Sequence, residues 1–106
     1  MVSKELLSEV FGWDIKFVNP RVNDNEISFV DYNGNVDSFN VYYVAHKCKE
    51  WALGKGYTLS TSYQGVCYIN LTIENNIYKY DKKITMETEP EAIFKACQWI
   101  YNNKEN

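Results

Sequence analysis

The chain has 106 residues, of which 45% are hydrophobic and 24% charged, and its formal net charge is −3. This length fits one domain over 1–106 with one hydrophobic core, and the composition excludes a disordered, collagen-like or coiled-coil chain. No long apolar run is present and charges occur at Lys4, Glu5 and Glu9, so we expect neither a membrane span nor a signal peptide.

The first part of the chain predicts a helix, a strand and a hairpin. Apolar residues over 3–11 fall on one helical face, and Gly12 offers a stop. A short strand over 15–18 ends at Asn19-Pro20, and the segment that follows has the composition of a loop. Strands at 26–32 and 35–39 are joined by Asn33-Gly34, which predicts a type I′ turn with both residues at positive φ.

The second part predicts two helices that flank an antiparallel meander. Asn40 is a plain N-cap candidate for a helix over 41–54. Three strands follow, joined by the turn pairs Gln64-Gly65 and Asn75-Asn76, at 57–63, 66–74 and 77–86. Their alternation leaves one polar face, which implies helices on the other face, and Lys82 interrupts the apolar side, which indicates a bulge or an edge.

The last helix has the clearest start, because Thr88-Glu89-Pro90-Glu91 is a capping box. We expect Trp51 and Trp99 to lie in the core on their helix stripes and 102–106 to fray. The predicted fold is therefore α+β, an antiparallel sheet (a hairpin plus a three-stranded meander) packed by helices in the order α-β-ββ-α-βββ-α.

Three stretches together resemble the phage ABA sandwich domain, a family of small phage and prophage proteins. They are a helix that ends in Gly-Trp, a helix that leads to Gly-Tyr, and a helix opened by an acidic-Pro-Glu-Ala phrase, here LLSEVFGWDIK, AHKCKEWALGKGY and ETEPEAIFKACQWI. The resemblance implies a phage or prophage origin and an α/β sandwich, and it brings no catalytic residues. The family name implies three layers, whereas the polar sheet face indicates two.

Several chemical functions lack the residues that they need. The three cysteines, Cys48, Cys67 and Cys97, include no CxxC pair, so we expect reduced core thiols and a reducing cytoplasm. His46 and Cys48 point apart on a helix and cannot chelate zinc, and DYNGNVD lacks the glycine and glutamate of a calcium loop. No catalytic or cofactor motif is present, so we expect no enzyme activity, no cofactor and no metal.

Nucleic acid is also a poor candidate partner. The protein is acidic and has one arginine, Arg21, whereas phosphate backbones attract basic surfaces. The final α-βββ-α order matches a double-stranded RNA-binding domain, but the last helix begins among Glu87, Glu89 and Glu91. These carboxylates would repel phosphate.

The remaining signal is an aromatic content of 16%. Tyrosine and tryptophan are enriched in binding hot spots. The residues that we expect to be exposed and to contact a partner are Trp13, Tyr32, Tyr42, Tyr43 and Tyr68. Asp and Glu around them would engage a basic surface of the partner.

The leading hypothesis is a non-catalytic, phage-encoded binding protein in the host bacterial cytoplasm. It would inhibit a host defence component, in the manner of an anti-CRISPR protein, by protein–protein contact. Two alternatives stay open: a sponge that sequesters a nucleotide immune signal between protomers of a dimer, and a phage structural or replication accessory. Pairing of exposed strand edges could also make a homodimer.

Overall fold

The computed structural model describes residues 2–21, 25–61, 66–73, 76–86 and 88–103. These residues form three helices and six strands, and the fold is α+β, as predicted. The helices are α1 (Lys4–Phe11), α2 (Val41–Gly54) and α3 (Glu89–Asn103). The strands are β1 (Ile15–Arg21), β2 (Glu26–Asp31), β3 (Val36–Asn40), β4 (Tyr57–Thr61), β5 (Val66–Ile73) and β6 (Asn76–Thr85).

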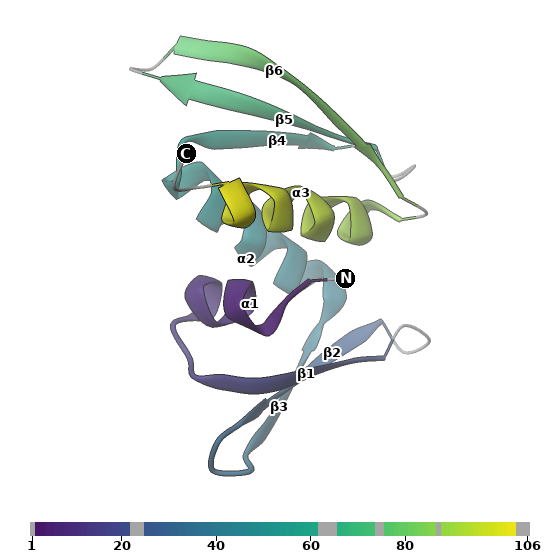
Figure 1. Ribbon diagram of the computed structural model, residues 1–106. Helices are drawn as coiled ribbons and strands as arrows, with labels where there is room; N and C mark the ends of the chain where they lie inside the picture. Colours follow the sequence, from purple (N-terminus) through teal and green to yellow (C-terminus); the bar gives the residue numbers. More distant parts are fainter. Residues whose placement is uncertain (1, 22–24, 62–65, 74–75, 87, 104–106) are drawn as a thin grey trace.

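The strands divide into two antiparallel sheets with the helices between them (Figure 1). One sheet has the order β1-β2-β3 and the other β4-β5-β6. Helix α1 packs on β1, α3 packs on the second sheet, and α2 contacts both sheets. The layers therefore run sheet, helices, sheet. The two-layer expectation is wrong, because β1 extends the hairpin into a separate sheet instead of leaving one sheet with one covered face.

Side-chain caps fix the start of each helix: Asn40 and Thr88 cap as predicted, whereas Ser3, expected inside the first helix, caps α1 from outside it. The Ser3 hydroxyl accepts a hydrogen bond from the Leu6 N–H at 3.1 Å, and the Asn40 side chain accepts from the Tyr42 N–H at 2.8 Å. At α3 the Thr88 Oγ1 accepts from the Glu91 N–H at 3.4 Å and donates to the Glu91 carboxylate at 3.1 Å. Each of these side chains satisfies an amide that the first helical turn leaves without a partner.

The hairpin turn differs from the prediction. Gly34 has φ 84°, whereas Asn25 is the only described non-glycine residue at positive φ, so the type I′ turn is wrong. The Gly34 N–H instead donates to the Asp31 carbonyl at 3.2 Å, and the Asp31 N–H donates to the Asn35 carbonyl at 3.0 Å. The loop thus has three residues with glycine at the left-handed position, which leaves Tyr32 at its tip.

Other strand boundaries also shift. β1 continues through Asn19-Pro20-Arg21, where a loop was predicted, because these residues pair with β2. β4 is described over Tyr57–Thr61, and the remainder of that predicted strand (62–63), the turn pair Gln64-Gly65, and residues 74 and 75 lie outside the described residues. Opposite Ile69 and Asn70 the register skips from Lys82 to Lys79, which is the irregularity expected at Lys82. Helix α3 runs to Asn103, so Asn102 and Asn103 are not frayed, and 104–106 lie outside the described residues.

The core is continuous through the helical layer. It takes Leu6 and Leu7 from α1, and the Ser3 N–H donates to the Gln98 side chain of α3 at 2.9 Å, which ties the start of α1 to the last helix. Trp51 and Trp99 are half-buried at the core margin instead of fully inside it. The Trp51 indole N–H donates to the Glu9 carboxylate at 2.8 Å and so joins α2 to α1.

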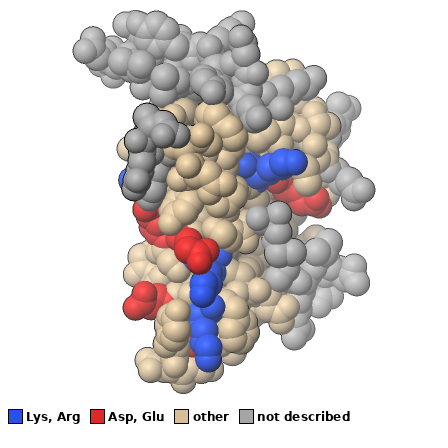
Figure 2. Space-filling view, viewed as in Figure 1, with Lys and Arg blue, Asp and Glu red and all other residues tan. Residues whose placement is uncertain are grey.

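Two further features concern the distribution of charge on the surface and the apolar length of the helices. Acidic and basic side chains are interspersed on the face shown in Figure 2. Among the described residues, no helix has the length and apolar character needed to cross a lipid bilayer.

Candidate binding site

A solvent-open hollow of about 510 Å³ lies between the end of α1 and the β2–β3 hairpin. We call it the Trp13 hollow. It combines one exposed indole with three carboxylates and, among the described residues that line it, has no lysine or arginine. Its lining residues are Trp13, Asp14, Ile15, Phe29, Asp31, Tyr32, Asn33 and Asp37.

The end of α1 positions Trp13. Gly12 has φ 70° and its N–H donates to the Ser8 carbonyl at 2.8 Å, which terminates the helix and turns the chain back. The Ser8 hydroxyl then accepts from the Ile15 N–H at 3.2 Å. These two bonds hold both ends of the Gly12–Ile15 link, so Trp13 and Asp14 project from a braced segment.

Aromatic packing supports the indole from behind. The Trp13 ring lies 5.6 Å from Phe11, 6.0 Å from Phe29 and 5.6 Å from Phe39, measured between ring centroids. Phe29 is buried and forms the floor, while Trp13 keeps 41% of its surface exposed. Tilted and edge-to-face ring contacts of this kind stabilise a fixed arrangement.

The hairpin supplies the acidic side of the hollow. Asp37 pairs with Phe29 across the β2–β3 ladder, which puts both side chains on the same face of the sheet. Asp31 is committed to the turn: its Oδ1 accepts from the Asn33 and Asn35 amides, each at 2.9 Å, and its Oδ2 accepts from the Asn35 side chain at 3.1 Å. Hydrogen bonding, first that from the Asn35 backbone, lowers the pKa of Asp31 below its ordinary value.

The other two carboxylates differ from Asp31. Within the described part of the chain, neither Asp14 nor Asp37 has a hydrogen-bond or ion-pair partner. The hollow therefore presents two available carboxylates and one that contributes charge while it holds the turn.

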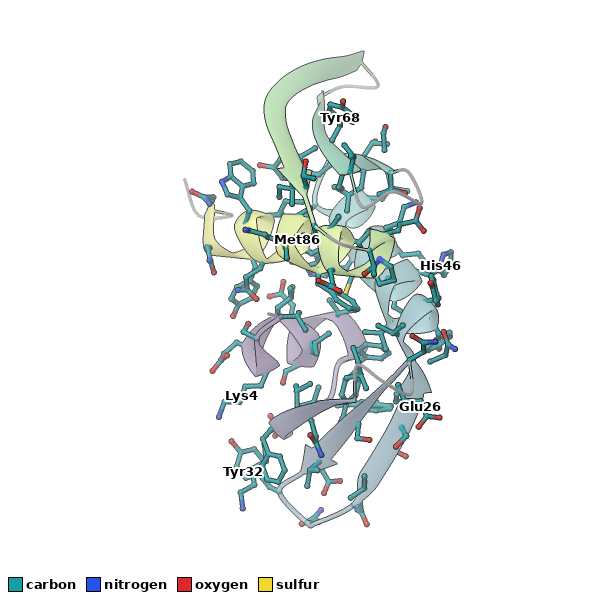
Figure 3. The ribbon with its side chains drawn as sticks, turned by 90° about the vertical axis from the view of Figure 1, so that its right-hand side faces the viewer. Lys4, Glu26, Tyr32, His46, Tyr68 and Met86 are labelled. Atoms are coloured by element: carbon teal, nitrogen blue, oxygen red, sulfur yellow. The ribbon has the colours of Figure 1, made fainter. Side chains whose placement is uncertain are left out.

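The five aromatic residues that the sequence singled out are all exposed but do not form one surface. Trp13 and Tyr32 line the hollow. Tyr43 stacks on Phe39 at 5.7 Å and carries the Lys47 ammonium 5.8 Å from its ring centroid, so it extends the aromatic cluster. Tyr42 makes no described ring contact with that cluster. Tyr68 lies on the outer side of the second sheet, at the opposite end of the molecule from Tyr32 (Figure 3).

Three residues of the site were not singled out by sequence reasoning. Asp31 and Asp37 appeared only as candidate calcium ligands in DYNGNVD, and Asp14 did not appear at all. The predicted two-residue turn at Asn33-Gly34 would have paired Asp37 with Val30, whereas the observed three-residue loop pairs it with Phe29, so the sequence offered no correct signal for this aspartate. The convergence with Trp13 depends on how α1 docks on the first sheet.

A second exposed apolar row lies on the other face of that sheet. Phe17 pairs with Val30 and Val30 pairs with Val36, and Phe17 and Val36 remain largely exposed. Beside this row the hydroxyls of Ser28 and Ser38 hydrogen bond to each other at 2.8 Å. The row itself offers apolar area, and among the described residues of β2 the charge on the same face is Glu26, beyond the Ser28–Ser38 pair.

Metal and thiol chemistry find little support among the described residues. No group of three or more histidine, cysteine or acidic side chains there could hold a metal ion. His46 is exposed and pairs with Glu50 at 2.7 Å, whereas Cys48 is buried. Burial raises the pKa of Cys67 to about 11, and the contact with Cys48 together with burial raises the pKa of Cys97 further, so both thiols stay protonated.

Comparison of the chain with models of known families, with curated proteins and with solved structures finds no match. The features of this chain that bear on function are the geometry of the Trp13 hollow and the resemblance of its three helical stretches to the phage ABA sandwich domain.

Proposed function

We propose that this chain is a non-catalytic binding protein that occupies a basic surface of a partner protein through the Trp13 hollow. The observation that carries the proposal is the convergence of a braced, exposed indole with three aspartates in one hollow. An aromatic anchor beside a charged rim is the usual composition of a protein–protein hot spot. Complementary charge would steer the partner and fix its orientation.

The biological setting of the proposal comes from the resemblance to phage ABA sandwich domains. We propose a phage or prophage origin, action in the cytoplasm of the host bacterium, and a target among the components of bacterial defence, such as a CRISPR effector. Inhibition would result from occupation of a basic surface on that target. Defence effectors that bind nucleic acid need such surfaces, because phosphate backbones are recognised by lysine and arginine.

The nucleotide-sponge alternative gains no support at this site. Asp14, Asp31 and Asp37 surround the indole on which a base would stack, and their charge would repel the phosphates of the nucleotide. No observation on the described residues favours a structural or replication role either.

A capture experiment with matched variants tests the proposal. Tagged wild-type protein, Trp13→Ala and Tyr68→Ala are used as baits in lysate of the natural bacterial host. Trp13 and Tyr68 are comparably exposed, at 41% and 48%, but lie on different sheets, so Tyr68→Ala controls for the loss of a surface aromatic side chain. Circular dichroism and a thermal melt confirm that each bait is folded.

The expected result is one stoichiometric basic-surfaced protein on the wild-type and Tyr68→Ala baits. Capture by Trp13→Ala should fall at least about tenfold, as for a hot-spot residue. Raising the salt from about 0.1 M to 0.5 M should weaken capture by the wild-type bait. Equal capture by Trp13→Ala and wild type would overturn the assignment of this site.

A further inference from the structure

We infer that the Trp13 hollow is a receptor for one arginine side chain, with the guanidinium stacked on the indole and held by Asp14 and Asp37. This inference rests on the proposed function and names the group of the partner that the site recognises.

The wall of the hollow is suited to a flat cation. The Trp13 indole is backed by Phe11, Phe29 and Phe39 at 5.6 to 6.0 Å, so its exposed surface is held in place. A guanidinium is planar, weakly hydrated and stacks on aromatic faces, and tryptophan is the strongest cation–π partner among the side chains. The ring therefore offers a preorganised platform.

The acceptors are suited to several N–H donors at once. Asp14 and Asp37 have no partner within the described residues, and they come from different elements, the α1–β1 link and β3. A guanidinium carries five donors in a fixed fork and can bond to carboxylates on two sides. Asp31 adds negative potential, but both of its carboxylate oxygens already accept hydrogen bonds within the hairpin turn.

The same lining disfavours the other ligand classes. An anion would meet three carboxylates, and an apolar ligand would cover Asp14 and Asp37 without replacing the hydrogen bonds that they make to water. The aspartates are not grouped as metal ligands among the described residues. A lysine ammonium would satisfy the charge, but it is a compact point charge and would not use the indole face as fully.

The test titrates the protein with acetyl-Gly-Arg-Gly-amide and follows the indole N–H signals by NMR. Trp13 reports on the hollow, while Trp51, bonded to Glu9, and Trp99 serve as internal references. The matched peptides replace arginine by citrulline, which is nearly isosteric but uncharged, and by lysine. We expect the arginine peptide to shift the Trp13 signal saturably, with a Kd of about 1–10 mM. The lysine peptide should bind at least about threefold more weakly, and the citrulline peptide should give no saturable shift.

Two variants test the carboxylates against a matched control. Asp14→Asn and Asp37→Asn should each weaken the arginine peptide by about fivefold. Glu26→Gln should leave its Kd unchanged, because Glu26 alternates with Ile27 in β2 and so lies on the face of the sheet opposite Phe29. An unshifted Trp13 signal at about 20 mM peptide, equal shifts with citrulline, or equal affinities for the Asp37→Asn variant and wild type would overturn the inference.

These results separate the inference from the proposed function. If the Trp13→Ala bait loses capture and the arginine peptide does not shift the Trp13 signal, the proposed function stays in place and the arginine receptor is overturned. The opposite result is a Trp13 signal that shifts saturably with the arginine peptide and not with the citrulline peptide, while the Trp13→Ala bait still captures its protein. This result supports the arginine receptor and overturns the proposed function.

Discussion

The two halves of the core differ in the side chains that fill them and in how completely those side chains are covered. Between α2, α3 and the second sheet, the interior combines small side chains with aliphatic ones such as Ile69 and Ile100 and is closed, with no exposed surface at Cys48, Ala52, Cys67, Ala96 or Cys97. Between α1 and the first sheet it is built from large rings, and the outermost of them, Trp13 and Tyr43, remain nearly half exposed.

Side-chain size explains this difference. Alanine and cysteine let α2 and α3 approach so closely that the Cys97 thiol donates to the Cys48 carbonyl at 3.4 Å. Five rings in mutual contact, some stacked and others tilted or edge-to-face, cannot all be covered by one eight-residue helix and a three-stranded sheet, so the cluster continues onto the surface. The binding site that we propose is the uncovered end of a hydrophobic core, and it is rigid because the rest of that core is behind it.

The largest contrast should appear in stability. Ile69→Ala removes a fully buried side chain from the closed half and should lower the free energy of unfolding by about 3 kcal/mol. Trp13→Ala removes a larger but half-exposed side chain and should cost about 1 kcal/mol, mainly its ring contacts. Urea unfolding of the two variants measures both values. A Trp13→Ala cost as large as that of Ile69→Ala would mean that the two halves are not distinct.

Alkaline pH should weaken the closed half in particular. Burial raises the pKa of Cys67 from 9.0 to about 11, so the folded state holds a proton that the unfolded chain releases. The stability associated with the buried thiol is complete below about pH 9 and is lost as the pH rises toward 11, an effect on the order of 2 kcal/mol.

Urea unfolding of wild type and Cys67→Ala at several pH values between about 8 and 11 measures this loss. The stability advantage of wild type over Cys67→Ala should shrink as the pH increases. A constant difference across the range would show that the Cys67 thiol titrates normally in the folded protein.

The smallest effects should come from glycine substitutions that sharpen the comparison at the hairpin. Gly34 has φ 84° with open space around its Cα, so Gly34→Ala should cost about 1 kcal/mol through backbone strain alone and should displace Tyr32. A Cβ added at Gly54 would point into open space, and Gly54 ends α2 without a positive φ. Gly54→Ala should therefore be neutral or stabilising by up to about 0.5 kcal/mol in the same urea experiment. Similar losses for both variants would contradict the assignment of strain to the turn.

The sequence predicted best those features that are decided locally. Asn40 and Thr88 bond to amides two or three residues away, so the starts of α2 and α3 followed from the sequence, and the cap at Ser3 placed the start of α1 within one residue of the prediction. The division into two sheets did not, because it depends on which strand edge β1 joins. The turn was misassigned because the Asp31 side chain competes for the amides of Asn33 and Asn35, which favours the three-residue loop.

The same reasoning applies to the candidate site. Exposure of Trp13 and Tyr32 was predicted, and both line the hollow. Tyr42 and Tyr68 are equally exposed, but their places on α2 and β5 put them outside it. The sequence identifies aromatic residues of the types that are common in binding sites. Which of them share a concave surface with unpaired carboxylates depends on how the helices pack on the sheets.

The bond between the Ser3 amide and Gln98 has a consequence for the order in which the molecule is made. Helix α1 is translated before α3, yet α3 contacts α1 and provides the Gln98 side chain that accepts from the Ser3 amide at the start of α1. The rings that back Trp13 all precede α3 in the chain, so the hollow and its support are translated before that helix. A nascent chain that stalls before α3 would carry every residue of the hollow but would lack the bond from Gln98 that holds the start of α1.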